Sequence, residues 1–143
     1  MQRWDHLEYL FSGWAVSTRA RDMLAEGGTG LLVDLCGRDR DKLDTPVVIE
    51  AWQRGDATAS RLMDDVIDTL ARGLCNVVAM LNPDTIVIGG GMAQAGEPFF
   101  RAVGEAVLRH VFAPFADNFT IKPAKLGESA VPVGALLLAA RAV

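Results

Sequence analysis

The sequence predicts an α/β fold in which an incomplete parallel sheet is flanked by helices. The second half of the chain alternates between helix-like and strand-like apolar patterns, an order typical of parallel strands joined by right-handed crossovers. Two short segments, residues 85–88 and 119–126, are convincing strands. Because two strands make a marginal sheet on their own, we expect the remaining strands to lie outside these 143 residues.

Residues 7–26 are predicted to form the first helix, because apolar residues recur there at helical spacing. Gly27 and Gly28 follow in the position where glycine commonly ends a helix. Residues 30–43 are ambiguous. They hold a short apolar piece and then a run of charged residues, which we interpret as a solvent-exposed loop.

Two further helices are predicted from their start signals. Asp44 and Pro46 suit the cap and the first turn of a short helix over residues 47–54. Asp56 is expected to cap a longer helix that ends near Leu81. The apolar residues of this longer helix share one face over about seven turns, which predicts that it packs against the core.

The rest of the chain supplies the strands and the last two helices. Residues 85–88 are predicted to be a buried strand, and residues 97–112 a helix. Residues 119–126 are the second strand, in which Pro123 favours a place towards the sheet edge because proline lacks an N–H donor. Residues 133–143 are predicted to form a helix of small and apolar residues.

The composition indicates one soluble domain over residues 1–143. Half of the residues are hydrophobic (50%), the net charge is −4, and no basic run is present, which argues against a nucleic-acid partner. No segment reaches the roughly 18–20 apolar residues of a membrane span, and no signal peptide is visible. Cys36 and Cys75 form no disulfide framework, so we expect a cytoplasmic protein without a membrane partner.

Three consecutive glycines, Gly89, Gly90 and Gly91, follow the first predicted strand. Glycine has no Cβ and tolerates positive φ, so this corner can bring bare backbone close to a flat or anionic ligand, and a nucleotide is the leading candidate. A dinucleotide fingerprint fits less well, because the third glycine it needs is replaced by Gln94. A purely structural glycine turn is the other alternative.

The segment from Leu81 to Gly91 closely resembles the C-terminal signature of the ROK family, which comprises sugar kinases and sugar-responsive repressors. Three other segments resemble this family in the same order: Leu7-Glu8 with Ser12-Gly13, Arg54-Gly55-Asp56, and Leu126-Gly127-Glu128 followed by Gly134-Ala135. The resemblance covers nearly the whole chain. It implies that residues 1–143 are the C-terminal portion of a ROK-type sugar kinase domain.

The resemblance implies the C-terminal lobe of an actin-like ATPase (ribonuclease H-like) fold. It also implies a parent activity, the ATP-dependent phosphorylation of a hexose, as in glucokinases, with magnesium as cofactor. Gly89, Gly90 and Gly91 would then lie against the adenine and ribose of ATP. Glu8 would contact sugar hydroxyls, because an ionised carboxylate accepts hydrogen bonds from neighbouring O–H donors. An exposed acid favoured by the helix dipole is the simpler interpretation of Glu8.

The resemblance also assigns packing roles and exposes departures from the family pattern. Gly134 and Ala135 would pack tightly at the domain junction. The family's N-terminal phosphate loop, the asparagine–aspartate pair that carries its general base and its zinc-binding cysteines are all absent. His6 stands where the last zinc ligand would fall, and a lone histidine is a poor structural zinc site. We therefore predict no metal-binding residue.

No catalytic residue is predicted either. The helical aspartates Asp64, Asp65 and Asp68 are interpreted as solvated charges, and His110 as structural or solvent-facing. The isolated chain is therefore expected to be inactive or nearly so, with hexose and ATP as implied partners. Two alternatives remain open: a fragment of a sugar-sensing repressor, and a non-catalytic module that forms homo-oligomers through its apolar surface.

Overall fold

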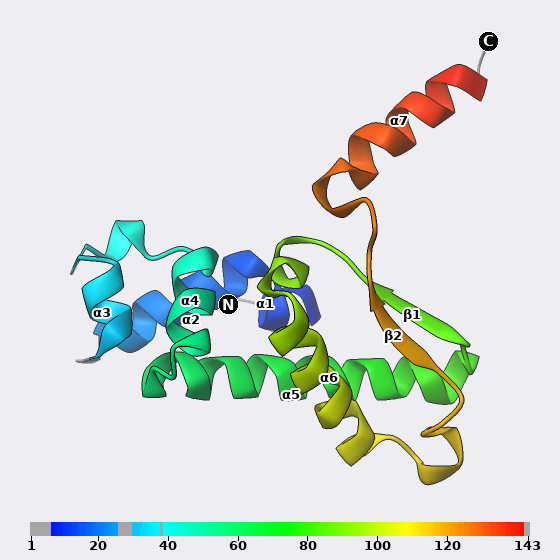
Figure 1. Cartoon of the computed structure of the whole chain (residues 1–143), viewed down its shortest axis with the longest axis horizontal. Helices are drawn as coiled ribbons and strands as arrows, with labels where there is room; N and C mark the ends of the chain where they lie inside the picture. Colours follow the sequence, from blue (N-terminus) through cyan, green and yellow to red (C-terminus); the bar gives the residue numbers. More distant parts are fainter. Residues whose placement is uncertain (1–6, 26–29, 38, 142–143) are drawn as a thin grey trace, which may run out of the picture.

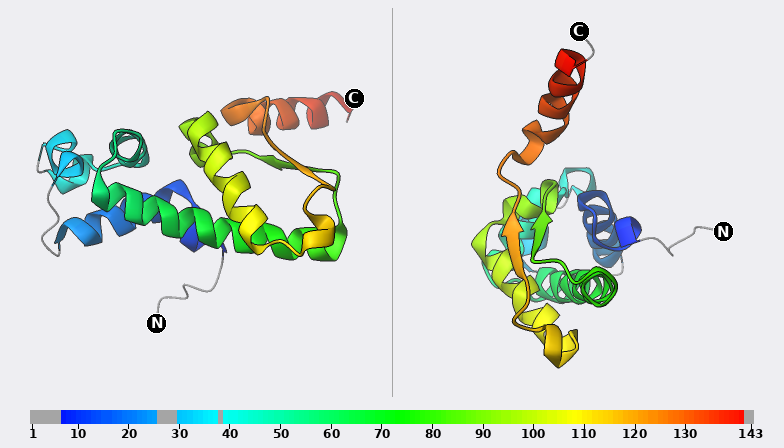
Figure 2. Two further views of the ribbon diagram at one scale, coloured as in Figure 1. Left: turned by 60° about the horizontal axis from the view of Figure 1, so that its bottom comes forward. Right: turned by 90° about the vertical axis from the view of Figure 1, so that its right-hand side faces the viewer.

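The computed structural model describes residues 7–25, 30–37 and 39–141 of the chain. Its centre is the helix α5 (Ala57–Leu81), against which the other helices of the body pack (Figures 1 and 2). These helices are α1 (Leu7–Phe11), α2 (Gly13–Ala25), α4 (Thr45–Gln53) and α6 (Glu97–His110). The predicted apolar face of α5 is confirmed, because most of its members are buried in one continuous hydrophobic core.

The predicted first helix is wrong in one respect, because the chain breaks it at Ser12. The Ser12 hydroxyl accepts a hydrogen bond from the Ala15 N–H at 3.3 Å, as a helix N-cap does. At Gly13 the backbone passes so close to Thr45 that an added Cβ would lie 3.2 Å from the Thr45 Oγ1 atom. The apolar stripe is therefore divided between α1 and α2, and Gly27 and Gly28 lie outside the described residues.

The predicted helix caps are confirmed. The Asp44 carboxylate accepts from the Val47 N–H at 3.0 Å at the start of α4. The buried Asp56 carboxylate accepts from the N–H groups of Thr58 and Ala59 at 2.9 and 2.8 Å at the start of α5. Both caps are local hydrogen bonds within three residues, which explains why the sequence predicts them well.

The ambiguous stretch, residues 30–43, contains the short helix α3 (Leu31–Leu35). Leu32 and Cys36 bury their side chains in the core. The charged run that follows is exposed over residues 39–42 and forms a 3₁₀ turn, Arg40–Lys42, which agrees with the predicted surface loop.

The sheet consists of two parallel strands in the described part of the chain, β1 (Thr85–Ile88) and β2 (Thr120–Pro123). The strands pair in register from Thr85 opposite Thr120 to Ile88 opposite Pro123, and α6 forms the crossover between them. The prediction of a parallel α/β unit is therefore confirmed. The prediction of a buried strand is wrong, because Val87 is 60% exposed while Ile88 is 7% exposed.

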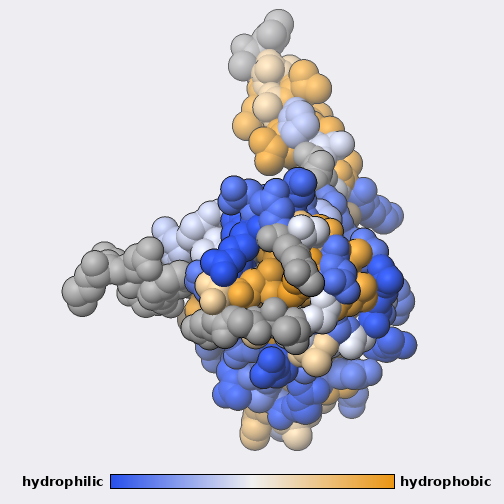
Figure 3. All heavy atoms as spheres, turned by 90° about the vertical axis from the view of Figure 1, so that its left-hand side faces the viewer, coloured by the Kyte–Doolittle hydropathy of each residue, from blue (hydrophilic) through white to orange (hydrophobic). Residues whose placement is uncertain are grey.

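The last helix, α7 (Ala130–Arg141), stands away from the body (Figures 1 and 2). It begins three residues before the predicted start, and it has no buried residue. A Cβ added at Gly134 would meet nothing within 4 Å, and Ala135 is exposed, so neither residue packs tightly against the described part of the chain. Figure 3 shows the projecting helix as a largely hydrophobic column above the body.

None of the helices in the described ranges combines the length and the apolar character needed to cross a membrane.

Candidate functional site

The three glycines after β1 have three different environments. A Cβ added at Gly89 would lie 3.2 Å from the Cβ of Ala124, where the Ala124 N–H donates to the Ile88 carbonyl at 2.9 Å. Gly90 has a φ of +85°, in the region that favours glycine. A Cβ added at Gly91 would meet nothing within 4 Å. Gly89 therefore allows the close approach of Ala124 at the end of the strand pair, whereas the backbone at Gly90 and Gly91 borders open space.

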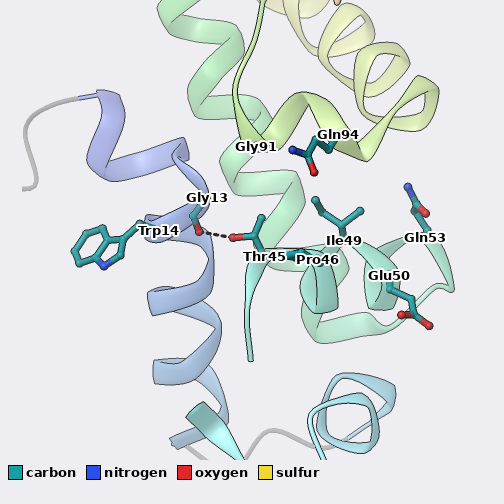
Figure 4. Close-up of a pocket in the computed structure, with 9 residues that line it drawn as sticks. All are labelled: Gly13, Trp14, Thr45, Pro46, Ile49, Glu50, Gln53, Gly91 and Gln94. Atoms are coloured by element: carbon teal, nitrogen blue, oxygen red, sulfur yellow. Dashed lines mark hydrogen bonds between the residues drawn. The ribbon is translucent and has the colours of Figure 1, made fainter. Parts of the chain in front are cut away.

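Gly91 borders a pocket of about 510 Å³. Three segments that are distant in sequence form it: the start of α2, one side of α4, and η2 (Gly91–Ala95), the 3₁₀ turn after the glycines (Figure 4). The lining residues are Gly13, Trp14, Thr45, Pro46, Ile49, Glu50, Gln53, Gly91 and Gln94. This volume lies within the range of roughly 300–1,000 Å³ that small-molecule sites have.

Two side-chain hydrogen bonds hold the walls of this pocket together. The Thr45 hydroxyl, at the first residue of α4, donates to the Gly13 carbonyl at 2.6 Å. The Gln53 side-chain amide, at the last residue of α4, donates to the Ala95 carbonyl at 2.9 Å. Helix α4 is therefore fixed at one end to α2 and at the other end to η2.

Sequence reasoning placed Gly91 at a ligand site but missed the α4 residues that face it. A signal for them exists, because Thr45, Ile49 and Gln53 are spaced four residues apart and must share one side of a helix. Their relation to the glycines is a tertiary contact across about forty residues of sequence, which no local pattern reports.

Glu8 lies in α1, but its side chain is outside the described part of the chain. Its predicted contact with a sugar therefore stays a prediction. His6, the candidate for an isolated metal ligand, also lies outside the described residues.

The aspartates of α5 lie away from the pocket, and two of them are ion-paired rather than simply solvated. Asp65 pairs with Arg19 of α2. Asp68 accepts from His110 Nε2 at 2.5 Å and from Arg72 Nε at 2.7 Å. The hydrogen bond from His110, followed by that from Arg72, lowers the pKa of Asp68 from 3.8 to about 2. His110 is thus a structural link between α6 and α5, as predicted.

The pocket offers no magnesium site of its own among the described residues. Its acidic lining residue is Glu50, whose carboxylate accepts from Arg54 at 3.0 Å. Magnesium in phosphoryl-transfer sites is commonly held by one or two carboxylates together with substrate phosphates. Across the described ranges, no three His, Cys, Asp or Glu side chains gather closely enough to hold a metal ion.

The ROK family sequence model matches residues 6–142, and the chain belongs to the ROK family. The glucokinase of Thermotoga maritima is a relative with 30% identity over 129 residues, which represent 90% of this chain and 40% of that enzyme. The chain therefore spans less than half the length of the curated relative that it matches.

Solved structures of the family share the fold. The ROK family glucokinase from Streptomyces griseus, determined in complex with glucose and AMPPNP, matches 92% of this chain and 43% of its own length with a TM-score of 0.79 and 22% identity. A ROK family transcriptional regulator, a homolog of the E. coli MLC protein, matches 82% of this chain and 28% of its own length with a TM-score of 0.67 and 15% identity. The chain therefore has an incomplete lobe of the actin-like ATPase fold.

Proposed function

We propose that this chain forms the nucleoside side of the nucleotide site in a ROK-type sugar kinase that transfers a phosphoryl group from ATP to a hexose hydroxyl. The observation that carries the proposal is the open backbone at Gly90 and Gly91 beside a pocket of about 510 Å³. Bare backbone lets a flat ring approach main-chain atoms more closely than any side chain allows. The glucokinase relative and the AMPPNP complex of a structural neighbour support the same assignment.

The kinase assignment is preferred to the repressor alternative on similarity. Among the solved structures, the glucokinase is 22% identical to this chain and the regulator is 15% identical over a smaller part of it. We therefore take hexose and ATP as the substrates of the parent activity, and Glu8 as the residue proposed for the sugar side.

The pocket of this chain can bind and orient a nucleoside, but it lacks the groups for phosphoryl transfer. That reaction needs a base for the attacking hydroxyl and cationic groups for the transferring phosphoryl. The one carboxylate in the lining is paired with Arg54, and none of the lining residues is cationic. We expect a coupled assay on several hexoses to show no turnover above background for these 143 residues alone.

Nucleotide binding is tested by adding a side chain at Gly91. Gly91→Val places bulk in the open space beside the pocket, and φ at this position needs no glycine, so the fold is expected to tolerate it. We expect calorimetry with AMPPNP to show at least a tenfold loss of affinity, about 1.4 kcal/mol. Gly90→Val is a weaker test, because the φ of +85° makes any loss ambiguous between backbone strain and occlusion.

The matched control is Gly104→Val in α6, because an added Cβ there also meets nothing within 4 Å and the site is away from this pocket. The assignment is wrong if the wild-type chain binds no AMPPNP at millimolar concentration. It is equally wrong if the Gly91 variant binds AMPPNP as tightly as the wild type and the Gly104 control do.

The oligomeric state stays a prediction. Leu136, Leu137 and Leu138 of α7 are exposed, and apolar surface of this kind favours association with a second copy. Light scattering at micromolar concentration tests this, and a strictly monomeric particle contradicts it.

A further inference from the structure

A second pocket, which we call the α6 pocket, lies between α6 and the chain that leads into β2, and its volume is about 250 Å³. It shares no lining residue with the pocket beside the glycines. Its lining residues are all apolar and come from α6 on one side and from residues 116–121 on the other. They are Phe100, Gly104, Val107, Leu108, Ala116, Phe119 and Ile121. Because no polar side chain is present to orient a ligand, the α6 pocket suits an apolar group.

Gly104 keeps the α6 pocket open. A Cβ added at this position would meet nothing within 4 Å, although Gly104 lies in the interior of α6. Glycine in a helix interior costs about 1 kcal/mol relative to alanine, and no close neighbour among the described residues requires it here. A cavity of about 150 Å³ can hold a benzene ring, so the α6 pocket has room for one phenyl side chain.

An exposed phenyl ring lies close to this pocket in the chain. Phe112 follows the end of α6, four residues after the lining residue Leu108 and four before the lining residue Ala116. Phe112 is 68% exposed and Leu108 is 59% exposed. The ring of Phe115 is a neighbour, with the two ring centroids 6.0 Å apart, but it leaves most of Phe112 in solvent. The end of α6 therefore carries both an unfilled apolar pocket and an uncovered ring.

Two charged residues of α6 are arranged so that they complement a second copy of the same helix. Glu105 and Arg109 are exposed and one turn apart, and neither forms an ion pair with another described residue. At about 100° per residue, both lie on the side of Leu108 opposite to Phe100 and Gly104. When two such helices pack antiparallel with Leu108 opposite Leu108, Glu105 of each copy comes close to Arg109 of the other.

We propose that α6 is the interface for a second copy of this chain, with the two helices antiparallel and Phe112 of each copy inserted in the α6 pocket of the other. A two-fold interface uses the same patch on both subunits, so the ring and the pocket that receives it must lie on one surface. With Leu108 at the two-fold axis, Phe112 of one copy is brought opposite Gly104 of the other, because each is four residues from Leu108. This interface uses none of the leucines of α7 and none of the residues of the nucleotide pocket.

The ring is tested with Phe112→Ala in the full chain, using sedimentation equilibrium. Wild type is expected to show a reversible equilibrium between monomer and dimer. Phe112→Ala should raise its dissociation constant about a hundredfold, because each dimer loses two buried rings. Met80→Ala is the matched control, since Met80 is 82% exposed at the end of α5 and lines neither pocket. It should leave the dissociation constant unchanged.

The pocket is tested with Gly104→Val, which adds a side chain in the open space and should weaken the dimer to a similar extent. An added Cβ has no close neighbour there, so the fold should be retained, and circular dichroism checks this. Mixing this variant with Phe112→Ala tests reciprocal insertion. One copy then keeps its ring and the other keeps its pocket, so a mixed dimer with one of the two insertions should form at concentrations where neither variant dimerises alone.

The charges are tested with Glu105→Arg and Arg109→Glu, each of which places like charges opposite one another across the two-fold axis. Each change should weaken the dimer severalfold at low salt. The variant that carries both changes should recover most of the affinity, because it restores both pairs in reverse. A role confined to one helix would change the unfolding midpoint of these variants without changing the dissociation constant of the dimer.

The proposed interface is wrong if wild type stays monomeric up to millimolar concentration, or if Phe112→Ala and Gly104→Val dimerise as wild type does. A dimer that survives both changes but is lost in Leu137→Ala belongs to α7 and overturns the proposal as well. Failure of the two mixed variants to associate also overturns it. None of these measurements uses a nucleotide, so their outcome is independent of the proposed function.

Discussion

Large apolar side chains are mostly buried in the helical body, whereas several are exposed in the limb formed by β1, β2 and α7. In the body, Phe99 of α6 is completely buried, and α5 buries most of its apolar face against neighbouring helices. In the limb, Leu137 of α7 is 61% exposed, and Val87 of β1 faces outwards as well. A helix that is apolar on all sides is normally buried. The difference teaches that the apolar residues of the limb lack covering neighbours among the described residues, whereas those of the body cover one another.

The difference in burial between the body and the limb is tested most directly by truncating one large side chain in each region. Phe99→Ala removes a fully buried ring and should lower the free energy of unfolding by about 3–5 kcal/mol. Leu137→Ala should change it by less than about 0.5 kcal/mol, because the side chain has little to lose. Urea denaturation followed by circular dichroism measures both. Similar losses in the two variants would mean that α7 is packed in solution.

A second test concerns the link between α5 and α3 within the body. The buried Asp56 carboxylate caps α5, and its Oδ2 atom also accepts from the Leu32 N–H of α3 at 3.2 Å. Asp56→Ala leaves buried N–H groups without an acceptor, which should cost about 3 kcal/mol. The exposed cap Asp44 is the matched control, and Asp44→Ala should cost about 1 kcal/mol. Equal losses in unfolding experiments would show that the link to α3 contributes nothing.

The smallest effect is expected at the exposed edge of the body, where His110 and Arg72 hold the Asp68 carboxylate. The pKa of Asp68 is lowered from 3.8 to about 2, so the folded state favours its ionised form. Its contribution to stability is therefore complete above pH 3.8 and is lost as the pH falls towards 2. We expect wild type to be more stable than Asp68→Asn at pH 6, and the difference to shrink towards pH 2. A difference that does not depend on pH would show that the carboxylate's ionisation is not involved.

The sequence predicted the features that depend on near neighbours. The caps at Asp44 and Asp56 and the amphipathic face of α5 each follow from patterns within one element. The parallel pairing of β1 and β2 follows from the helix between them. The break at Ser12 was missed because the apolar stripe continues across it, and the cause is a tertiary approach to Thr45.

The candidate site was predicted only in part for the same reason. A run of glycines is visible in the sequence, and it indicated where the backbone would be bare. The opposite wall, Thr45 to Gln53, enters the pocket through the packing of α4 on α5 and through its bonds to Gly13 and Ala95. The exposure of β1 was missed because a β-branched run signals burial only where a partner is present to cover it.

The glycine corner has a consequence for the interpretation of natural variants. The three glycines are constrained differently: Ala124 crowds any side chain at position 89, the positive φ disfavours one at position 90, and nothing within the described fold opposes one at position 91. An alanine found at position 91 in a homologous protein would be compatible with a sound structure. Its presence would mark a lineage in which the demand for an unobstructed main chain had been relaxed.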